Sequence, residues 1–139
     1  MEQLKSASFI YTTGFFMDSS RETIQMICDQ AVKLNKPLGF NLSAPFFIDI
    51  YIKEMLKTLE YCDYVFCNDD EAAVMAKHLG LDSKDVKGVA KKIAQMPKAN
   101  KRRQERIVLI TCGKDPTILA SSNGKGNVSV KGIPVPKLD

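Results

Sequence analysis

Four short runs rich in apolar residues alternate along the chain with segments that carry helical periodicity. The apolar runs are residues 6–16, 36–45, 63–68 and 106–113. The segments between them, residues 18–36, 46–62, 69–80 and 82–97, place apolar residues three or four positions apart, as amphipathic helices do. Strands that alternate with helices favour an α/β fold, layered, with a mainly parallel sheet flanked by helices.

Local signals indicate where the helices begin and end. Ser19 or Ser20 is expected to cap the first helix, and Asp82 or Ser83 the last one. Gly80 is a C-terminal stop for the third helix. The start of the second helix is poorly defined, because its first residues are β-branched and aromatic.

The C-terminal tail has a different pattern. Residues 116–136 alternate apolar and polar side chains around the turn signal Asn123–Gly124, which predicts a C-terminal β pair. The run 106–113 is expected to be a buried, central strand. A chain of 139 residues with 45% hydrophobic content has the size of a single domain with a real core.

Much of the formal net charge of +4 comes from one segment, the sequence PKANKRRQER at residues 97–106. Its basic residues have no aromatic residues between them and form no recognition motif. This favours a solvated loop between a helix and a strand over a nucleic-acid patch. We therefore expect no nucleic-acid partner.

The four cysteines, Cys28, Cys62, Cys67 and Cys112, are predicted to be buried, reduced thiols. They form no CxxC pair or zinc spacing, and His78 is the one histidine. No apolar run approaches membrane-spanning length, and the first residues lack the apolar core of a signal peptide. We expect a cytoplasmic protein, with the nucleus as the alternative, and no membrane partner.

Polar residues follow three of the predicted strands, where they would share one edge of the sheet. Ligands of parallel α/β sheets collect beyond the carboxyl ends of the strands, so we expect these groups to converge on one crevice. They are Asn41 with Ser43, Asn68 with Glu71, and Thr111 with Gly113.

Residues 68–71, an amide followed by three carboxylic acids, open the third predicted helix and allow two interpretations. An N-cap amide and first-turn acids stabilise a helix without any further function. Alternatively, the helix N-terminus favours a phosphate, and Mg²⁺ keeps waters that a carboxylate can hold. Glu71 would then organise Mg²⁺-bound waters, and Asn68 would be a neutral hydrogen-bond partner.

Two other side chains are weaker candidates. Phe46 and Phe47 follow a strand end, where one ring would suit a flat ligand, but a Phe pair at the start of an amphipathic helix is by default core. His78 is interpreted as a surface helix residue without a catalytic role.

Taken in order, four segments resemble the ribokinase, or PfkB, family of sugar and nucleoside kinases, and within it the members that phosphorylate adenosine. They are FNLSAPF, YVFCNDDEAA, the helical pair that ends in KKIAQMPK, and RIVLITCGKDPTI. The similarity extends from TTGFF near the start to IPVPKLD at the end. It implies an α/β core with a small β lid and Mg²⁺-dependent transfer of the γ-phosphate of ATP to the 5′-hydroxyl of adenosine, giving AMP in purine salvage.

The same resemblance implies roles for individual residues. The family's Asn-x-x-Glu element matches residues 68–71, and the loop that lines its ATP site matches residues 111–113. Four residues would contact ATP, one of them holding the metal through water, and two would contact adenosine. The first set is Asn68, Glu71, Thr111 and Gly113, with Glu71 as the metal residue, and the second is Phe46 and Asn41.

The sequence also departs from the family pattern. The family's Gly-Ala-Gly-Asp element, which supplies the anion hole and the catalytic base, does not occur in it, and neither does the N-terminal lid region. We therefore expect residues 1–139 to be a single, partial kinase core without a catalytic residue. Removing one oxyanion-hole donor costs about 10² to 10³ in rate, so the chain alone is expected to be inactive.

Two alternatives to an adenosine-phosphorylating parent protein stay open. One is a related nucleoside or sugar kinase of the same family. The other is a non-catalytic α/β module that binds a nucleotide or serves as an interaction unit. The intact protein is expected to be a monomer, and the isolated chain to self-associate through uncovered sheet edges.

Overall fold

The computed structural model describes residues 6, 8–14 and 20–136. Six strands form one sheet in the order in which they occur in the chain. The first four strands are parallel and the last two are antiparallel, which confirms the mainly parallel sheet and the C-terminal β pair. The strands are β1 (Ile10–Thr13), β2 (Leu38–Asn41), β3 (Tyr64–Asn68), β4 (Arg106–Cys112), β5 (Asp115–Ser122) and β6 (Val128–Ile133).

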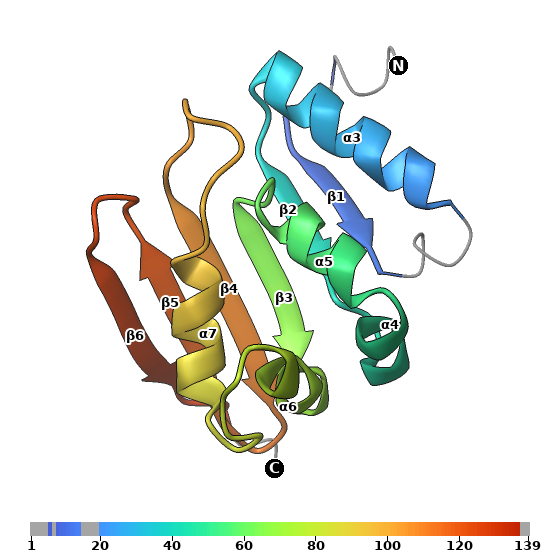
Figure 1. The fold of residues 1–139 in the computed structure, drawn as a ribbon. Coiled ribbons are helices and arrows are strands. Elements are labelled where there is room, and N and C mark those ends of the chain that lie inside the picture. Colours follow the sequence, from blue (N-terminus) through green and yellow to red (C-terminus); the bar gives the residue numbers. More distant parts are fainter. Residues whose placement is uncertain (1–5, 7, 15–19, 137–139) are drawn as a thin grey trace.

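Helices lie over one face of this sheet (Figure 1). They are α3 (Arg21–Leu34), α4 (Pro45–Ile50), α5 (Ile52–Leu59), α6 (Asp69–His78) and α7 (Val86–Ala94). Alternate strand residues point to opposite faces, and those toward the helices, such as Val65, Val108 and Ile110, are fully buried. Their neighbours on the other face, such as Phe66 and Leu109, are only partly buried. The core therefore lies between the sheet and the helices.

Two of the predicted helix boundaries are confirmed. Ser20 caps α3, because its Oγ accepts the backbone N–H of Thr23 at 3.2 Å, whereas Ser19 lies outside the described residues. Helix α6 ends at its C-cap Leu79, and the next residue, Gly80, has a φ of +73°. Glycine adopts this left-handed conformation without a steric penalty, so it ends a helix readily.

Two other boundary predictions are wrong. The helix predicted over 46–62 is divided into α4 and α5 at Tyr51, whose backbone (φ −114°, ψ 29°) is not helical. Helix α7 is capped by Asp85 rather than by Asp82 or Ser83, since the Asp85 Oδ1 accepts the N–H of Gly88 at 2.9 Å. Asp82 instead accepts the N–H of Lys84, in the turn before the helix.

The basic segment 97–106 is, as predicted, a largely exposed loop between α7 and β4, but it is not solvated throughout. Lys98 and Arg106 are buried. The Lys98 ammonium lies 2.6 Å from the Asp63 carboxylate, which also accepts the N–H of Leu38. The Arg106 guanidinium donates to five backbone carbonyls, those of Leu59, Cys62, Ile93, Met96 and Pro97. We call this arrangement the Arg106 cluster.

Two further arginines of the segment contact the C-terminal end of α3. Arg102 donates to the carbonyl of Val32, and Arg103 donates to the carbonyl of Asn35 at 3.2 Å. The last carbonyls of a helix lack partners within the helix and carry its negative partial charge, so cations stabilise them. These charges therefore have partners within the chain itself.

The prediction of buried, reduced thiols is confirmed for three of the four cysteines. All four are free, and Cys28, Cys62 and Cys67 are buried. Burial raises the pKa of the Cys28 thiol to about 12, and it raises the pKa values of Cys62 and Cys67 as well. Cys112 is partly exposed, so for this residue the prediction is wrong. In the described part of the chain, no helix combines the length and the hydropathy needed to cross a membrane.

Candidate functional site

A cavity of about 470 Å³ lies at the carboxyl ends of β2, β3 and β4. Four of the six predicted ligand-binding residues line it: Asn41, Asn68, Glu71 and Thr111. The parallel register explains why they meet, because Asn41 pairs with Phe66 and Asn68 pairs with Thr111. The remaining lining residues are Ser43, Phe66, Cys67, Leu109 and Thr117. The polar groups thus converge at one edge of the sheet, and their role in ligand binding stays a prediction.

Asn68 and Glu71 are held by a reciprocal capping box at the start of α6. The Asn68 Oδ1 accepts the N–H of Glu71 at 2.9 Å, and the Glu71 Oε1 accepts the N–H of Asn68 at 3.1 Å. The purely structural interpretation of these two residues is therefore present in the molecule. It does not exclude the second interpretation, since both residues also line the cavity.

Glu71 is 4% exposed, which is unusual for a carboxylic acid. Loss of solvation raises the pKa of its carboxyl group. The hydrogen bond from the Asn68 backbone N–H lowers this pKa, and the nearby carboxylates of Asp70 and Asp69 raise it. A carboxylate that is costly to bury and faces a cavity would gain from a cation or from ordered water there.

Asn41 is held in a tight turn after β2. Its Oδ1 accepts the backbone N–H of Ser43 at 2.8 Å, and the Ser43 hydroxyl donates to the Asn41 carbonyl at 3.2 Å. Ser43 has a φ of +75°, in the left-handed region that few residues other than glycine adopt. The turn leads to Ala44, which is the N-cap of α4.

The other two predicted residues do not line this cavity. Gly113 lies in the turn between β4 and β5 with a φ of +59°. Phe46 is 57% exposed, and its ring centroid is 4.3 Å from that of Phe47, which is buried. Assigning the Phe pair to the core is therefore correct for Phe47 and wrong for Phe46.

Thr117 lines the cavity, although its sequence context gave no indication of this. It belongs to β5, which returns antiparallel beside β4 after the turn at Gly113. A register shift between Ile110 and Cys112 makes the pairing near the turn irregular. The alternation of apolar and polar residues along the tail predicts the strand. It does not predict which residue of β5 lies near Thr111, because that depends on this register shift.

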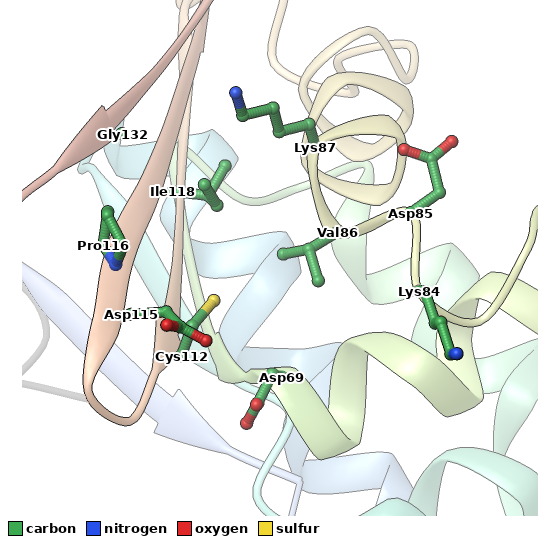
Figure 2. Close-up of a pocket in the computed structure, with 10 residues that line it drawn as sticks. All are labelled: Asp69, Lys84, Asp85, Val86, Lys87, Cys112, Asp115, Pro116, Ile118 and Gly132. Atoms are coloured by element: carbon green, nitrogen blue, oxygen red, sulfur yellow. The ribbon is translucent and has the colours of Figure 1, made fainter.

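A second cavity, of about 510 Å³, lies between the N-terminus of α7 and the turn from β4 to β5. Figure 2 shows Val86, Ile118 and Cys112 around it, with Asp69 below and Lys87 above. Side chains of neighbouring strand residues point to opposite faces. Accordingly Cys112 and Ile118 line this cavity, whereas Thr111 and Thr117 line the first. None of the predicted ligand-binding residues lines it.

His78 lies at the exposed end of α6, as predicted for a surface helix residue. Its Nε2 is 2.8 Å from the Oδ1 of Asp49, on α4. The contact joins two helices and lies outside the cavity at the carboxyl ends of the strands.

Comparison with known proteins gives consistent results at the level of sequence. The family model described as pfkB family carbohydrate kinase matches residues 1–138. The chain is 37% identical over 134 residues to adenosine kinase 2 of Arabidopsis thaliana, a match that covers 96% of this chain and 38% of the relative. It is 37% identical over 117 residues to the adenosine kinase of Schizosaccharomyces pombe, covering 84% of this chain and 34% of the relative.

Solved structures are similar over the same extent. The chain superimposes on Anopheles gambiae adenosine kinase in complex with P1,P4-di(adenosine-5) tetraphosphate with a TM-score of 0.89 at 35% identity, covering 99% of this chain and 39% of that one. For Schistosoma mansoni adenosine kinase in complex with adenosine and AMP, the TM-score is 0.88 at 29% identity, covering 99% and 40%. The chain spans 38% of the length of its Arabidopsis relative. It belongs to the pfkB family of carbohydrate kinases.

Proposed function

We propose that residues 1–139 are part of an adenosine kinase, which transfers the γ-phosphate of ATP to the 5′-hydroxyl of adenosine. The observation that carries this proposal is the cavity in which Asn68, Glu71 and Thr111 meet at the carboxyl ends of parallel strands. The relatives with 37% identity are adenosine kinases, and one similar structure holds adenosine and AMP. Because the chain belongs to this kinase family, ATP is the proposed phosphoryl donor.

Within this proposal the cavity binds the phosphate end of ATP. Asn68, at the N-cap of α6, and the Thr111 hydroxyl, at the end of β4, hold phosphoryl oxygens. Gly113 lets the chain turn sharply beside them. The exposed ring of Phe46 forms a wall of the adenosine site. Positioning of this kind is the main contribution of protein groups to phosphoryl transfer.

Mg²⁺ fits this set of groups if it is held through water. Among the described residues, no group of three or more His, Cys, Asp or Glu side chains is placed to hold a metal ion directly. Mg²⁺ in kinases keeps several waters and binds through substrate phosphates and one or two carboxylates. Glu71, buried at the cavity wall, is the residue that would orient such waters. When bound, the ion neutralises charge on the phosphates.

The proposal is tested by Mg²⁺- and ATP-dependent phosphorylation of adenosine. The 139-residue chain is assayed beside a chain extended by the coding sequence that flanks it, under identical conditions. We expect activity in the extended chain alone, because the sequence contains no anion-hole element. Activity of the short chain would contradict that account of the anion hole. An extended chain without any kinase activity would favour a non-catalytic nucleotide-binding or interaction module.

A panel of phosphoryl acceptors distinguishes adenosine from the alternative substrates, which are other nucleosides and sugars. The extended chain is offered adenosine, other nucleosides and simple sugars at equal concentrations, and product formation is compared. The expected result is a preference for adenosine. A preference for a sugar would replace the proposed substrate while leaving family membership unchanged.

A further inference from the structure

Two side-chain amides line the cavity at the carboxyl ends of the strands, and each has its oxygen engaged by the backbone. The Asn41 Oδ1 accepts the N–H of Ser43, and the Asn68 Oδ1 accepts the N–H of Glu71. An amide whose oxygen accepts a backbone N–H offers its nitrogen, a donor only, to other partners. Both residues therefore present hydrogen-bond donors, at the ends of neighbouring parallel strands.

The remaining polar groups of the cavity define the ligand that suits it. Among the described residues that line the cavity there is no lysine or arginine, and Glu71 is the one carboxylic acid. Anionic oxygens must then be bound by neutral donors, with a cation to offset Glu71. The amides of Asn41 and Asn68 and the hydroxyls of Thr111 and Thr117 are such donors.

The turn at Ser43 sets the orientation of the Asn41 amide. Its backbone N–H donates to the Asn41 Oδ1 at 2.8 Å, and Ser43 itself adopts the left-handed conformation, with a φ of +75°. The Ser43 hydroxyl donates to the backbone carbonyl of Asn41 in the same turn, and this carbonyl also accepts the N–H of Gly14. A backbone held in a rare conformation by two local bonds, at a cavity wall, favours a functional explanation.

We propose that Asn41 binds phosphoryl oxygens through its amide nitrogen, instead of binding adenosine, and that Ser43 is the positioning residue that orients this amide. The assignment rests on the proposed function only in taking the ligand to carry phosphate. It gives Asn41 and Asn68 the same task on neighbouring strands.

The first test uses inorganic tripolyphosphate with Mg²⁺ as the probe and ¹⁵N NMR of the side-chain amide groups of the 139-residue chain. We expect the Asn41 and Asn68 NH₂ signals to shift over the same range of probe concentration, and adenosine alone to leave the Asn41 signals in place. A shift of Asn68 without Asn41, a shift of Asn41 caused by adenosine, or no shift of either residue would overturn the proposal. Because no phosphorylation is measured, failure of the adenosine kinase assignment stays distinguishable from failure here.

Asn41→Asp tests the donor while keeping the turn, since aspartate also accepts the Ser43 N–H. We expect its dissociation constant for Mg-tripolyphosphate to rise about tenfold or more, because a donor becomes a negative acceptor. Asn123→Asp is the matched control: the Asn123 Oδ1 accepts the N–H of Lys125 at 2.8 Å in a similar turn outside this cavity. Equal losses in the two variants would contradict the assignment.

Ser43→Gly and Ser43→Val test the positioning role. Glycine keeps the N–H and adopts a positive φ freely. The affinity of Ser43→Gly for Mg-tripolyphosphate is therefore expected to stay within about twofold of wild type. Valine is strongly disfavoured at this φ, so Ser43→Val should raise the dissociation constant for Mg-tripolyphosphate well beyond twofold. The Asn41 NH₂ signals should move toward exposed-amide positions in the valine variant alone. Wild-type affinity and signals in Ser43→Val would refute the role of Ser43.

Discussion

At the scale of single residues, Glu71 serves the helix and the cavity together. Its Oε1 completes the capping box of α6, and the same side chain lines the cavity. Burial raises the pKa of its carboxyl group, so the folded chain holds this proton more tightly than the unfolded chain does. The charge at position 71 therefore costs stability, which points to a benefit other than folding.

Glu71→Gln separates these two contributions. Glutamine also completes a capping box, so the variant should fold. The unfolded carboxyl titrates near pH 4.3 and the folded one at higher pH, so wild-type stability falls as pH rises from the first value through the second. Urea unfolding should show that the variant gains stability relative to wild type between these pH values.

The same variant in the extended chain should lose turnover by about 10- to 100-fold, because an uncharged amide orients Mg²⁺-bound waters poorly. Steady-state rates measured across a range of Mg²⁺ concentrations check this. An unchanged rate with an unchanged Mg²⁺ dependence would remove Glu71 from the site.

Phe46 and Phe47 should respond differently to truncation. Phe46→Ala removes a ring that is 57% exposed and should change the free energy of unfolding by less than about 1 kcal/mol. Phe47→Ala removes a buried ring and should cost about 3 to 5 kcal/mol. If Phe46 is a wall of the adenosine site, its variant should raise KM for adenosine in the extended chain without changing KM for ATP. Parallel changes in both constants would argue against that role.

At the scale of the elements, the Arg106 cluster joins the C-terminal ends of two helices to the start of β4. The guanidinium donates to carbonyls at or near the ends of α5 and α7, groups that lack partners within their helices. Arg106 is fully buried, so no water replaces these bonds. One side chain thereby fixes two helices against the sheet, at the end opposite the candidate site.

Arg106→Met should destabilise the chain strongly. Methionine fills part of the space but removes all five hydrogen bonds that the buried guanidinium donates, so we expect a loss of about 3 to 5 kcal/mol in the free energy of unfolding. Arg103→Met is the control, because Arg103 is partly exposed and contacts one carbonyl, that of Asn35. Its cost should be about 1 kcal/mol or less. Urea unfolding monitored by circular dichroism measures both, and similar losses would contradict the special role of Arg106.

How far these elements follow from the sequence depends on how local their causes are. The strands and the Ser20 cap were predictable, because periodicity and cap chemistry act within a few residues. The break at Tyr51 and the burial of Arg106 were not, because they depend on elements distant in the chain. The convergence of Asn41, Asn68 and Thr111 followed from parallel topology, whereas Thr117 depended on an irregular register.

At the scale of the whole molecule, the described helices lie over one face of the sheet, and the other face carries aromatic side chains. Two pairs lie along it, Phe9 with Tyr64 and Tyr11 with Phe66, with ring centroids 5.5 and 6.2 Å apart. Phe9 is 42% exposed and Tyr11 is 52% exposed. Contiguous apolar surface of this kind is uncommon on soluble monomers.

The 139-residue chain is therefore expected to self-associate. Sedimentation velocity between about 5 and 100 µM should show a mean mass that rises with concentration, and a dye specific for apolar surface should bind. Phe9→Lys with Tyr11→Lys should reduce both signals by adding charge to the aromatic face. A monomer of high thermal stability across this range would contradict the expectation.

The order of the strands in the sheet has a consequence for synthesis on the ribosome. Spatial order and chain order are identical for the six described strands, β1 to β6, so each of them pairs with the described strands made just before and just after it. Strands β2, β3 and β4 can thus be added to one growing edge as they emerge, each after the helix or helices that precede it in the chain. β5 and β6 then extend the same edge as simple hairpins. Among the described strands, none has to wait for a described partner encoded far downstream, which shortens the time that their bare edges are open to neighbouring nascent chains.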